Sequence, residues 1–171
     1  MRLRAAGASI RGPLHRSTGA SCEDCWLAHS DARGTVLAVA DGLGSRPQAR
    51  LGARAAVRAV RQAWRHWSLS PRGKAEDLVR LVEVLWRIAL GEIEPNDAAT
   101  TCLVCAVPRD RDGVLAQLGD GLVGTLRSGE FSALVAPREG FGTETHALGV
   151  PHGMRDWTLA PLSALGEGDA V

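Results

Sequence analysis

Acidic residues beside glycines are the side chains in this sequence best placed to bind a metal ion or to take part in catalysis. Asp41-Gly42 directly follows the short apolar run at residues 36–40, which predicts a buried strand. A carboxylate at the end of a buried strand is costly unless another group pairs with it, and glycine lets the backbone bend closely around it. Hard cations prefer oxygen ligands. The sequence therefore predicts that Asp41 is the centre of a metal site.

Two further acidic sites, Glu23-Asp24 and Asp120, lie beside predicted strands that could bring them close to Asp41. Glu23-Asp24 comes just before a predicted strand at residues 26–29, and residues 31–34 form a turn signal before the strand that ends at Asp41. The two strands are expected to form a hairpin, which brings Glu23-Asp24 and Asp41 to the same end of a sheet. Asp120 likewise follows a predicted strand and stands between two glycines.

The other predicted elements favour an antiparallel α+β protein. The spacing of apolar residues predicts helices at residues 47–67 and 75–90. Strands are expected at residues 6–10, 98–107, 114–118, 122–126, 131–135 and 157–160. Strands, then two consecutive helices, then strands joined by short turns are typical of an antiparallel α+β fold rather than a parallel βαβ wind.

Each predicted helix has an apolar face. The first is expected to bury Ala53, Ala56, Val57, Val60, Trp64 and Trp67, and the second Leu78, Leu81, Val82, Leu85 and Ile88. The opposite face of the first helix carries Arg50, Arg54, Arg58, Arg61 and Arg65. Such a basic stripe could bind phosphates. We favour a solvated helix face beside a compensating acidic neighbour.

Composition limits the class of protein. The chain has 171 residues, of which 45% are hydrophobic and 23% charged, so we expect one domain with a real core rather than a disordered or membrane protein. The N-terminus lacks the apolar core of a signal peptide, which makes a cytoplasmic location the default expectation. The formal net charge of +1 gives no global field that favours nucleic acid.

The cysteines form two C-x-x-C pairs, Cys22/Cys25 and Cys102/Cys105. This spacing suggests zinc, but the gap between the pairs is long. The second pair also lies in a predicted strand, where residues three apart point to opposite faces. We therefore expect buried, reduced thiols rather than a zinc site.

Two other patterns are given little weight. His146 and His152 share a glycine-rich loop, where solvated histidines are more common than metal ligands. Residues 119–124 spell G-x-G-x-x-G, but a dinucleotide site requires a helix after this motif and none is predicted.

Four motifs, in order along the chain, resemble those of the metal-dependent protein phosphatases of type 2C, the PPM family. C-E-D-C-W at residues 22–26 resembles the first acidic box, and V-L-A-V-A-D-G-L-G-S at 36–45 resembles a strand followed by D-G-x-G. D-A-A-T-T-C-L-V at 97–104 resembles the G-A-T-T strand, and L-A-Q-L-G-D-G at 115–121 resembles the G-D-S/G strand. Residues 8–24 look like the bacterial branch, in which a G-x-x-H loop precedes an acidic pair.

The resemblance implies a four-layer α-β-β-α sandwich of two antiparallel sheets flanked by helix pairs, with two Mg²⁺ or Mn²⁺ ions at the sheet edge. The implied reaction is hydrolysis of phosphoserine or phosphothreonine through a metal-bridged water, in bacterial signalling. The implied partner is a phosphorylated protein, for example the substrate of a Ser/Thr kinase. No nucleic-acid or membrane partner is expected.

The resemblance also assigns roles by position. Asp41 would bridge the two metals, and Gly42 would provide its backbone carbonyl. Glu23 would bind the second metal, and Asp24 would orient metal-bound water, so that Asp24 and Asp41 are the catalytic pair. Asp120 would fit a third, weaker metal position.

Several features depart from the family pattern. Gly19 stands where the family often has a phosphate-binding arginine, which leaves His15, Arg16 or Arg11 as candidates. Leu43 stands where some members have a histidine proposed as general acid.

The family domain continues beyond the motifs found here. Its next strand and a later loop carry two further ligands of the first metal, and Asp169 resembles only the opening of that strand. We therefore expect residues 1–171 to be the N-terminal part of a single PPM-type domain, incomplete at the C-terminus, aggregation-prone and nearly inactive by itself. The alternative is a catalytically dead PPM-fold module that binds a phosphoprotein or regulatory partner. A third hypothesis is an unrelated nucleic-acid binder that uses the arginine stripe.

Overall fold

The computed structural model describes residues 3–19, 21–134 and 146–171. A five-stranded antiparallel sheet has the order β1-β2-β3-β4-β7, and β5 and β6 form a second, two-stranded antiparallel sheet. The strands are β1 (Asp24–Asp31), β2 (Gly34–Asp41), β3 (Cys102–Pro108), β4 (Gly113–Leu118), β5 (Val123–Arg127), β6 (Glu130–Leu134) and β7 (Thr158–Leu162). The helices are α1 (Pro13–Thr18), α2 (Ala49–Trp67) and α3 (Ala75–Leu90), with short 3₁₀ turns η1 (Pro95–Ala98) and η2 (Met154–Asp156).

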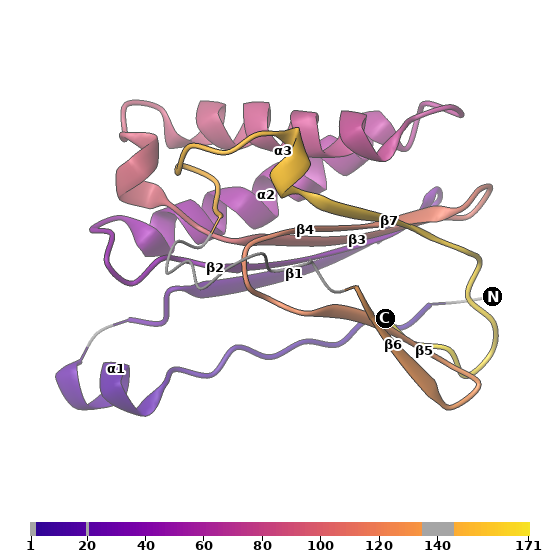
Figure 1. Ribbon diagram of the computed structural model, residues 1–171, viewed down its shortest axis with the longest axis horizontal. Helices are drawn as coiled ribbons and strands as arrows, with labels where there is room; N and C mark the ends of the chain where they lie inside the picture. Colours follow the sequence, from indigo (N-terminus) through magenta and orange to yellow (C-terminus); the bar gives the residue numbers. More distant parts are fainter. Residues whose placement is uncertain (1–2, 20, 135–145) are drawn as a thin grey trace.

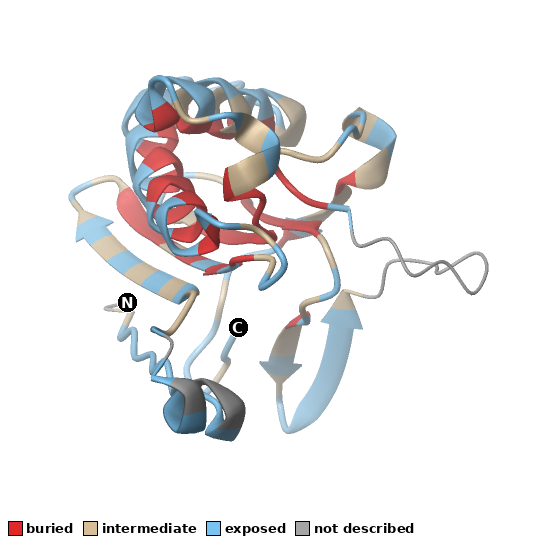
Figure 2. Ribbon diagram, turned by 90° about the vertical axis from the view of Figure 1, so that its left-hand side faces the viewer, coloured by how far each residue is buried: buried red, intermediate tan, exposed pale blue. Residues whose placement is uncertain are grey.

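These elements form layers (Figure 1). α2 and α3 cover one face of the five-stranded sheet, while α1, the N-terminal segment and the β5-β6 sheet lie on the other side. Buried residues concentrate where the two helices meet the sheet (Figure 2). The α+β class and the two antiparallel sheets are confirmed. The part of the chain that the structure describes contains one flanking helix pair.

The hairpin of β1 and β2 forms as the sequence predicts. Its register pairs Asp24 with Asp41 at one end and Asp31 with Gly34 at the other. Along β2, Val36, Ala38 and Ala40 are buried beneath the helices, whereas Val39 and Asp41 are exposed on the opposite face. The alternation of the strand therefore sends the Asp41 side chain away from the helices.

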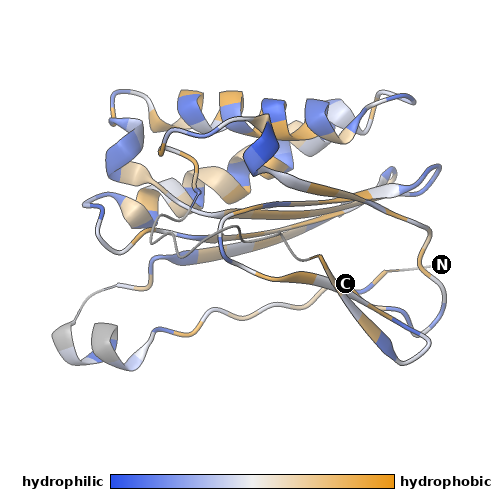
Figure 3. Ribbon diagram, viewed as in Figure 1, coloured by the Kyte–Doolittle hydropathy of each residue, from blue (hydrophilic) through white to orange (hydrophobic). Residues whose placement is uncertain are grey.

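Long helices follow their periodicity closely. α2 buries every residue expected of it, and α3 has the predicted bounds. The expectation for Ile88 is wrong, because this residue is 69% exposed. The buried stripe of α3 ends in Trp86 and Leu90 instead. Ile88 lies two residues after Trp86 and so points to the other side of the helix. Hydrophilic and hydrophobic residues alternate along both helices (Figure 3), and Val84 of α3 is exposed like Ile88.

Two predictions near the N-terminus are wrong. Residues 6–10 form no strand, although they pass so close to β1 that a Cβ on Gly7 would lie 2.6 Å from the Trp26 ring. The polar loop expected after Pro13 contains α1, which has proline in its first turn and is followed by the left-handed Gly19 (φ +74°). Proline at the start and glycine after the end favour a helix even in a short segment.

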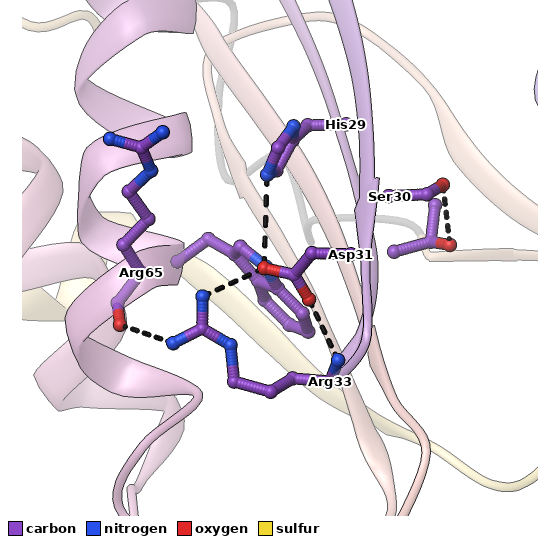
Figure 4. Close-up of polar contacts among 7 residues, drawn as sticks. His29, Ser30, Asp31, Arg33 and Arg65 are labelled. Atoms are coloured by element: carbon purple, nitrogen blue, oxygen red, sulfur yellow. Dashed lines mark hydrogen bonds and ion pairs between the residues drawn. The ribbon is translucent and has the colours of Figure 1, made fainter.

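At the end of the hairpin far from Asp41, polar contacts join β1 to α2 (Figure 4). The Asp31 carboxylate accepts hydrogen bonds from the Arg33 guanidinium at 2.8 Å and from the Trp64 indole at 3.2 Å. Arg33 also donates to the Arg65 carbonyl oxygen in the last turn of α2, at 3.1 Å. These bonds hold the hairpin against the helix.

Among the described residues, no helix is long and apolar enough to cross a membrane.

Candidate metal centre

One pocket gathers the acidic residues that the sequence points to. It has a volume of about 450 Å³, and Glu23, Asp24, Asp41 and Asp120 all line it. Gly42, Gly44 and Thr101 complete much of its wall. Three separate connections meet here: the start of β1, the end of β2 and the turn after β4. The structure therefore brings together all four carboxylates, although they come from positions far apart in the chain.

The backbone of Asp41 is held by two threonines at the start of β3. The Asp41 N–H donates to the Thr101 hydroxyl oxygen at 3.0 Å. Its carbonyl oxygen accepts from the Thr100 hydroxyl at 2.9 Å and from the Thr101 N–H at 2.8 Å. The sequence marks this T-T pair as part of a motif without giving it a role. Its role in the structure is to fix the peptide that carries the central carboxylate.

Gly42 allows the chain to turn sharply from β2 toward α2. A Cβ at this position would lie 2.6 Å from the carbonyl oxygen of Ala49, the first residue of α2. Real side chains do not tolerate so short a distance to backbone, so glycine is needed here for close approach. The site and the N-terminal end of α2 are consequently direct neighbours.

The four carboxylates crowd one another. The pKa of Asp41 is raised to about 6, mainly by burial, then by a side-chain hydrogen bond with Asp24 and by the negative charges of Asp24, Asp120 and Glu23. Each of these influences disfavours a charged Asp41. A cation in the pocket would reverse this balance.

The donor chemistry fits a hard divalent cation. Oxygen ligands from carboxylates and a backbone carbonyl suit Mg²⁺ and Mn²⁺. Within the described residues, no group of three or more His, Cys, Asp or Glu side chains is placed to hold one ion directly. Mg²⁺ commonly binds through one or two carboxylates and keeps several waters, so a loose acidic pocket is compatible with it. The acids share a pocket without forming a closed ligand shell.

Of the three candidates for binding substrate phosphate, His15 and Arg16 lie on α1, and Arg11 lies just before it. Gly12 and Pro13, at the start of this helix, line the pocket. Arg16 is exposed and is not part of the pocket wall, and its backbone N–H donates to the Gly12 carbonyl. The side chain of His15 lies outside the described residues. The assignment of a phosphate-binding role to any of these residues stays a prediction.

The histidines of the glycine-rich loop behave differently from each other. His146 is largely exposed, 3.9 Å from Asp156. The expectation of solvation is wrong for His152, whose ring nitrogens contact the Val150 carbonyl at 2.7 Å and the Glu83 carboxylate at 3.0 Å. The Trp157 indole donates to the same Glu83 oxygen at 2.7 Å. Sequence patterns missed this cluster because its members lie about seventy residues apart.

The cysteine prediction is confirmed for the second pair. Cys102 packs in the core beneath the helices and Cys105 in the smaller cluster on the other face of the sheet. Burial raises the pKa of each thiol to about 12. Cys22 lines the acidic pocket, where its thiol lies 3.5 Å from Asp24. All four cysteines are free thiols.

The α+β fold of the chain, with an acidic pocket at one end of its large antiparallel sheet, agrees with the comparisons with known proteins. Residues 11–171 match the family described as protein phosphatase 2C. The chain belongs to this family. No curated protein matches the sequence.

Solved structures share the fold. The photosystem II phosphatase PBCP superposes with a TM-score of 0.68 at 18% identity, over 94% of this chain and 60% of that one. The PPM Ser-Thr phosphatase MsPP from Mycobacterium smegmatis, in complex with cacodylate, gives 0.58 at 19% identity, over 87% and 69%. The S. agalactiae serine/threonine phosphatase gives 0.59 at 18%, over 87% and 71%. The chain thus spans 60% of the length of the first of these.

Proposed function

We propose that residues 1–171 belong to a single PPM-type domain that takes part in metal-dependent hydrolysis of phosphoserine or phosphothreonine in a phosphorylated protein. Family membership and the fold support a phosphatase. The observation that carries the proposal is the shared pocket of Glu23, Asp24, Asp41 and Asp120, with Asp24 and Asp41 paired across the hairpin.

We assign each residue a role from the family resemblance and from its position in the pocket. Glu23, Asp41 and the Gly42 carbonyl oxygen would hold Mg²⁺ or Mn²⁺. When bound, two such cations supply an acidified water and neutralise the charge of phosphate oxygens. Asp24, hydrogen-bonded to Asp41, would orient the attacking water and accept its proton. Asp120 would add a more weakly bound ligand, at the turn after β4. Thr100 and Thr101 would keep the Asp41 peptide in place.

The test combines metal binding with hydrolysis. Titration calorimetry with Mn²⁺ and turnover of p-nitrophenyl phosphate and of phosphoserine and phosphothreonine peptides would be measured on the wild-type chain and on Asp41→Asn. We expect the substitution to weaken Mn²⁺ binding by at least about tenfold, since ligand charge sets the affinity of hard cations. Metal-dependent turnover should fall at least as much.

A matched control removes an acid outside the pocket. Asp110 is exposed in the turn between β3 and β4, and Asp110→Asn should leave both metal binding and turnover unchanged. Turnover that persists with chelator, or that survives in Asp41→Asn, would refute the proposed roles.

A second candidate is a catalytically dead module of the same fold that binds a phosphoprotein or regulatory partner. It is favoured by one observation, the lack of a closed three-ligand group among the described residues. Binding of a phosphopeptide that needs no Mn²⁺, together with no Mn²⁺ binding in the calorimetry, would support this second function against the first.

A further inference from the structure

The outer face of α2 carries five arginines in one line. Arg50, Arg54, Arg58, Arg61 and Arg65 are all exposed, which confirms that they face solvent. A helix turns by about 100° per residue, so the five side chains fall within an arc of about 80° and extend along about 22 Å of the axis. We call this feature the arginine ridge.

The acidic neighbour expected beside this helix face forms no ion pair with the ridge among the described residues. α2 itself contains no Asp or Glu. In residues 3–19, 21–134 and 146–171, none of the five guanidinium groups forms an ion pair or a hydrogen bond. Arg65 contributes only its backbone carbonyl to the contacts with Arg33, and Figure 4 shows its guanidinium group turned away from the Asp31 cluster.

Three arginines elsewhere in the chain hold parts of the fold together. Arg33 is paired with Asp31, Arg111 stacks over Trp67 at 4.3 Å and donates to the Ser70 carbonyl, and Arg127 donates to the Ser163 carbonyl at 2.7 Å. The five ridge guanidiniums serve no such purpose. Successive ridge arginines are separated by about 4.5–6 Å along the axis. This separation is less than the screening length of about 8 Å in physiological salt, so their fields add.

The ridge is fixed in position relative to the acidic pocket. The opposite face of α2 is buried, including Val60, Trp64 and Trp67, so the helix cannot turn about its axis without breaking the core. Its first residue, Ala49, lies against Gly42, next to Asp41. The N-terminal end of the ridge, Arg50, therefore follows closely in the chain on the loop of residues 42–44 that lines the pocket, and the ridge runs away from there along the outer face of α2.

We propose that the arginine ridge is the docking surface for an acidic, extended protein segment next to the phosphorylated residue of the substrate. This inference rests on the proposed function and names the class of substrate. An extended chain rises about 3.3 Å per residue, so the ridge matches about seven residues. Guanidinium groups bind aspartate and glutamate carboxylates through strong, often paired hydrogen bonds.

Two other polyanionic partners fit less well. Single-stranded nucleic acid is usually gripped by basic residues together with exposed aromatic rings on which bases stack, but the aromatic rings of α2, those of Trp64 and Trp67, are buried. A helix that lies on an anionic membrane needs a free apolar face, and the apolar face of α2 is occupied by the core.

The test measures binding without relying on hydrolysis. Fluorescence anisotropy would follow two labelled peptides, one with serine followed by six Asp or Glu residues and one with Gln in those six positions, at low and moderate salt. The full chain would be compared with Arg54→Gln/Arg58→Gln/Arg61→Gln. We expect the wild-type chain to prefer the acidic peptide, with a preference that falls as salt rises, and the ridge variant to lose at least about fivefold in affinity for it.

The matched control removes three exposed arginines elsewhere, as Arg72→Gln/Arg80→Gln/Arg87→Gln, and so changes net charge equally. It should bind the acidic peptide as the wild type does. Equal losses in both triple variants would show a general charge effect and overturn the proposal. So would tighter, ridge-dependent binding of a DNA oligonucleotide or of phosphatidylserine vesicles than of the acidic peptide.

The same peptides carrying phosphoserine separate this proposal from the proposed function. Ridge-dependent binding without phosphate release would leave the docking surface intact and refute hydrolysis. Phosphate release at the same catalytic efficiency from acidic and Gln peptides would refute the docking surface and leave hydrolysis intact.

Discussion

The two faces of the five-stranded sheet are similar in sequence and different in structure. On the face beneath α2 and α3, Val36 and Ala40 of β2 are 0% exposed. On the opposite face, Val39 is 49% exposed and Trp26 of the neighbouring strand 39%. Apolar side chains thus occur on both faces, but only one face has helices to cover it. An apolar residue in a strand indicates that its side chain is better buried than exposed. Whether a helix or another strand covers it depends on the rest of the fold.

The small β5-β6 sheet covers only part of the open face. Leu103, Cys105 and Leu115 are buried with Val123 of β5 and Leu162 of β7 in a separate cluster. Farther along the face toward β1, the N-terminal segment lies against the sheet, but Trp26 and Val39 stay partly exposed. Asp24 and Asp41 lie on this same face, at its end. The candidate metal centre therefore belongs to the open side of the sheet, while the covered side supplies the rigid support for it.

The largest expected effect comes from replacing one tryptophan on each face, Trp64 on the covered face and Trp26 on the open face. Trp64 is 0% exposed on the covered face, where it packs 6.1 Å from Trp67 between ring centroids and donates to Asp31. Trp64→Ala should lower the free energy of unfolding by about 3–5 kcal/mol, because it leaves a cavity. Trp26→Ala, on the open face, should cost only about 1 kcal/mol. Urea denaturation at several protein concentrations measures both.

An equal cost for the two substitutions would contradict the comparison, because it would mean that the open face is covered in solution. The dependence of the urea midpoint on protein concentration then shows whether a second copy of the chain covers the open face. A midpoint that rises with protein concentration would show self-association through the open face. That association is the one expected of an apolar surface of this kind.

Asp31 tests the covered side at the end of the sheet far from the pocket. Burial alone would raise its pKa, but hydrogen bonds from Arg33 and Trp64 and the charge of Arg33 outweigh burial and lower it from 3.8 to about 2. Its stabilisation is therefore complete well above pH 4 and is lost as the pH falls through about 2. We expect a contribution of about 1 kcal/mol or less, because solvent screens the group.

The measurement is the difference in unfolding free energy between the wild-type chain and Asp31→Asn. This difference should be constant from pH 7 to 5 and should shrink between pH 4 and 2. A difference that stays constant down to pH 2 would show that Asp31 titrates normally and that its contacts with Arg33 and Trp64 do not stabilise its charged form.

Much of the fold could be predicted from the sequence where the signals are local. The β1-β2 hairpin follows from alternation and a turn, and it correctly places Asp24 beside Asp41. α2 and α3 follow from their periodicity. Residues 6–10 were misassigned because a short apolar run does not reveal whether another strand is available to pair with it.

Contacts between distant segments were beyond such reasoning. The link between Glu83 of α3 and His152 joins residues that no periodic pattern relates. In the candidate site, the acids were found from their glycine neighbours, whereas the bonds from Thr100 and Thr101 to the Asp41 backbone emerge only once β3 is placed beside β2. The metal-binding and catalytic roles of these acids stay predictions.

The smallest expected effect is a difference in labelling rate between Cys102 and Cys105. These two cysteines lie on opposite faces of the same strand, β3. Cys102 faces the helices and Cys105 the β5-β6 sheet, and burial raises the pKa of both thiols to about 12. The thiolate is the reactive form, so neither should react with iodoacetamide until its surroundings open. Movement of the small sheet and of the two chain ends that line the same pocket as Cys105 would expose this thiol, whereas exposing Cys102 would require α2 and α3 to move away. Local openings of small elements cost less than global unfolding.

The experiment uses Cys22→Ser/Cys25→Ser, so that only the two strand cysteines remain, and follows each by mass spectrometry after digestion. Cys105 should be labelled faster than Cys102 in the absence of denaturant, and the rate at Cys102 should follow the urea dependence of global unfolding. Equal rates at the two positions would mean that the open face is as well protected as the covered one. Faster labelling of Cys102 would mean that the helices, rather than the small sheet, are the less stable cover, and the proposed difference between the two faces would be reversed.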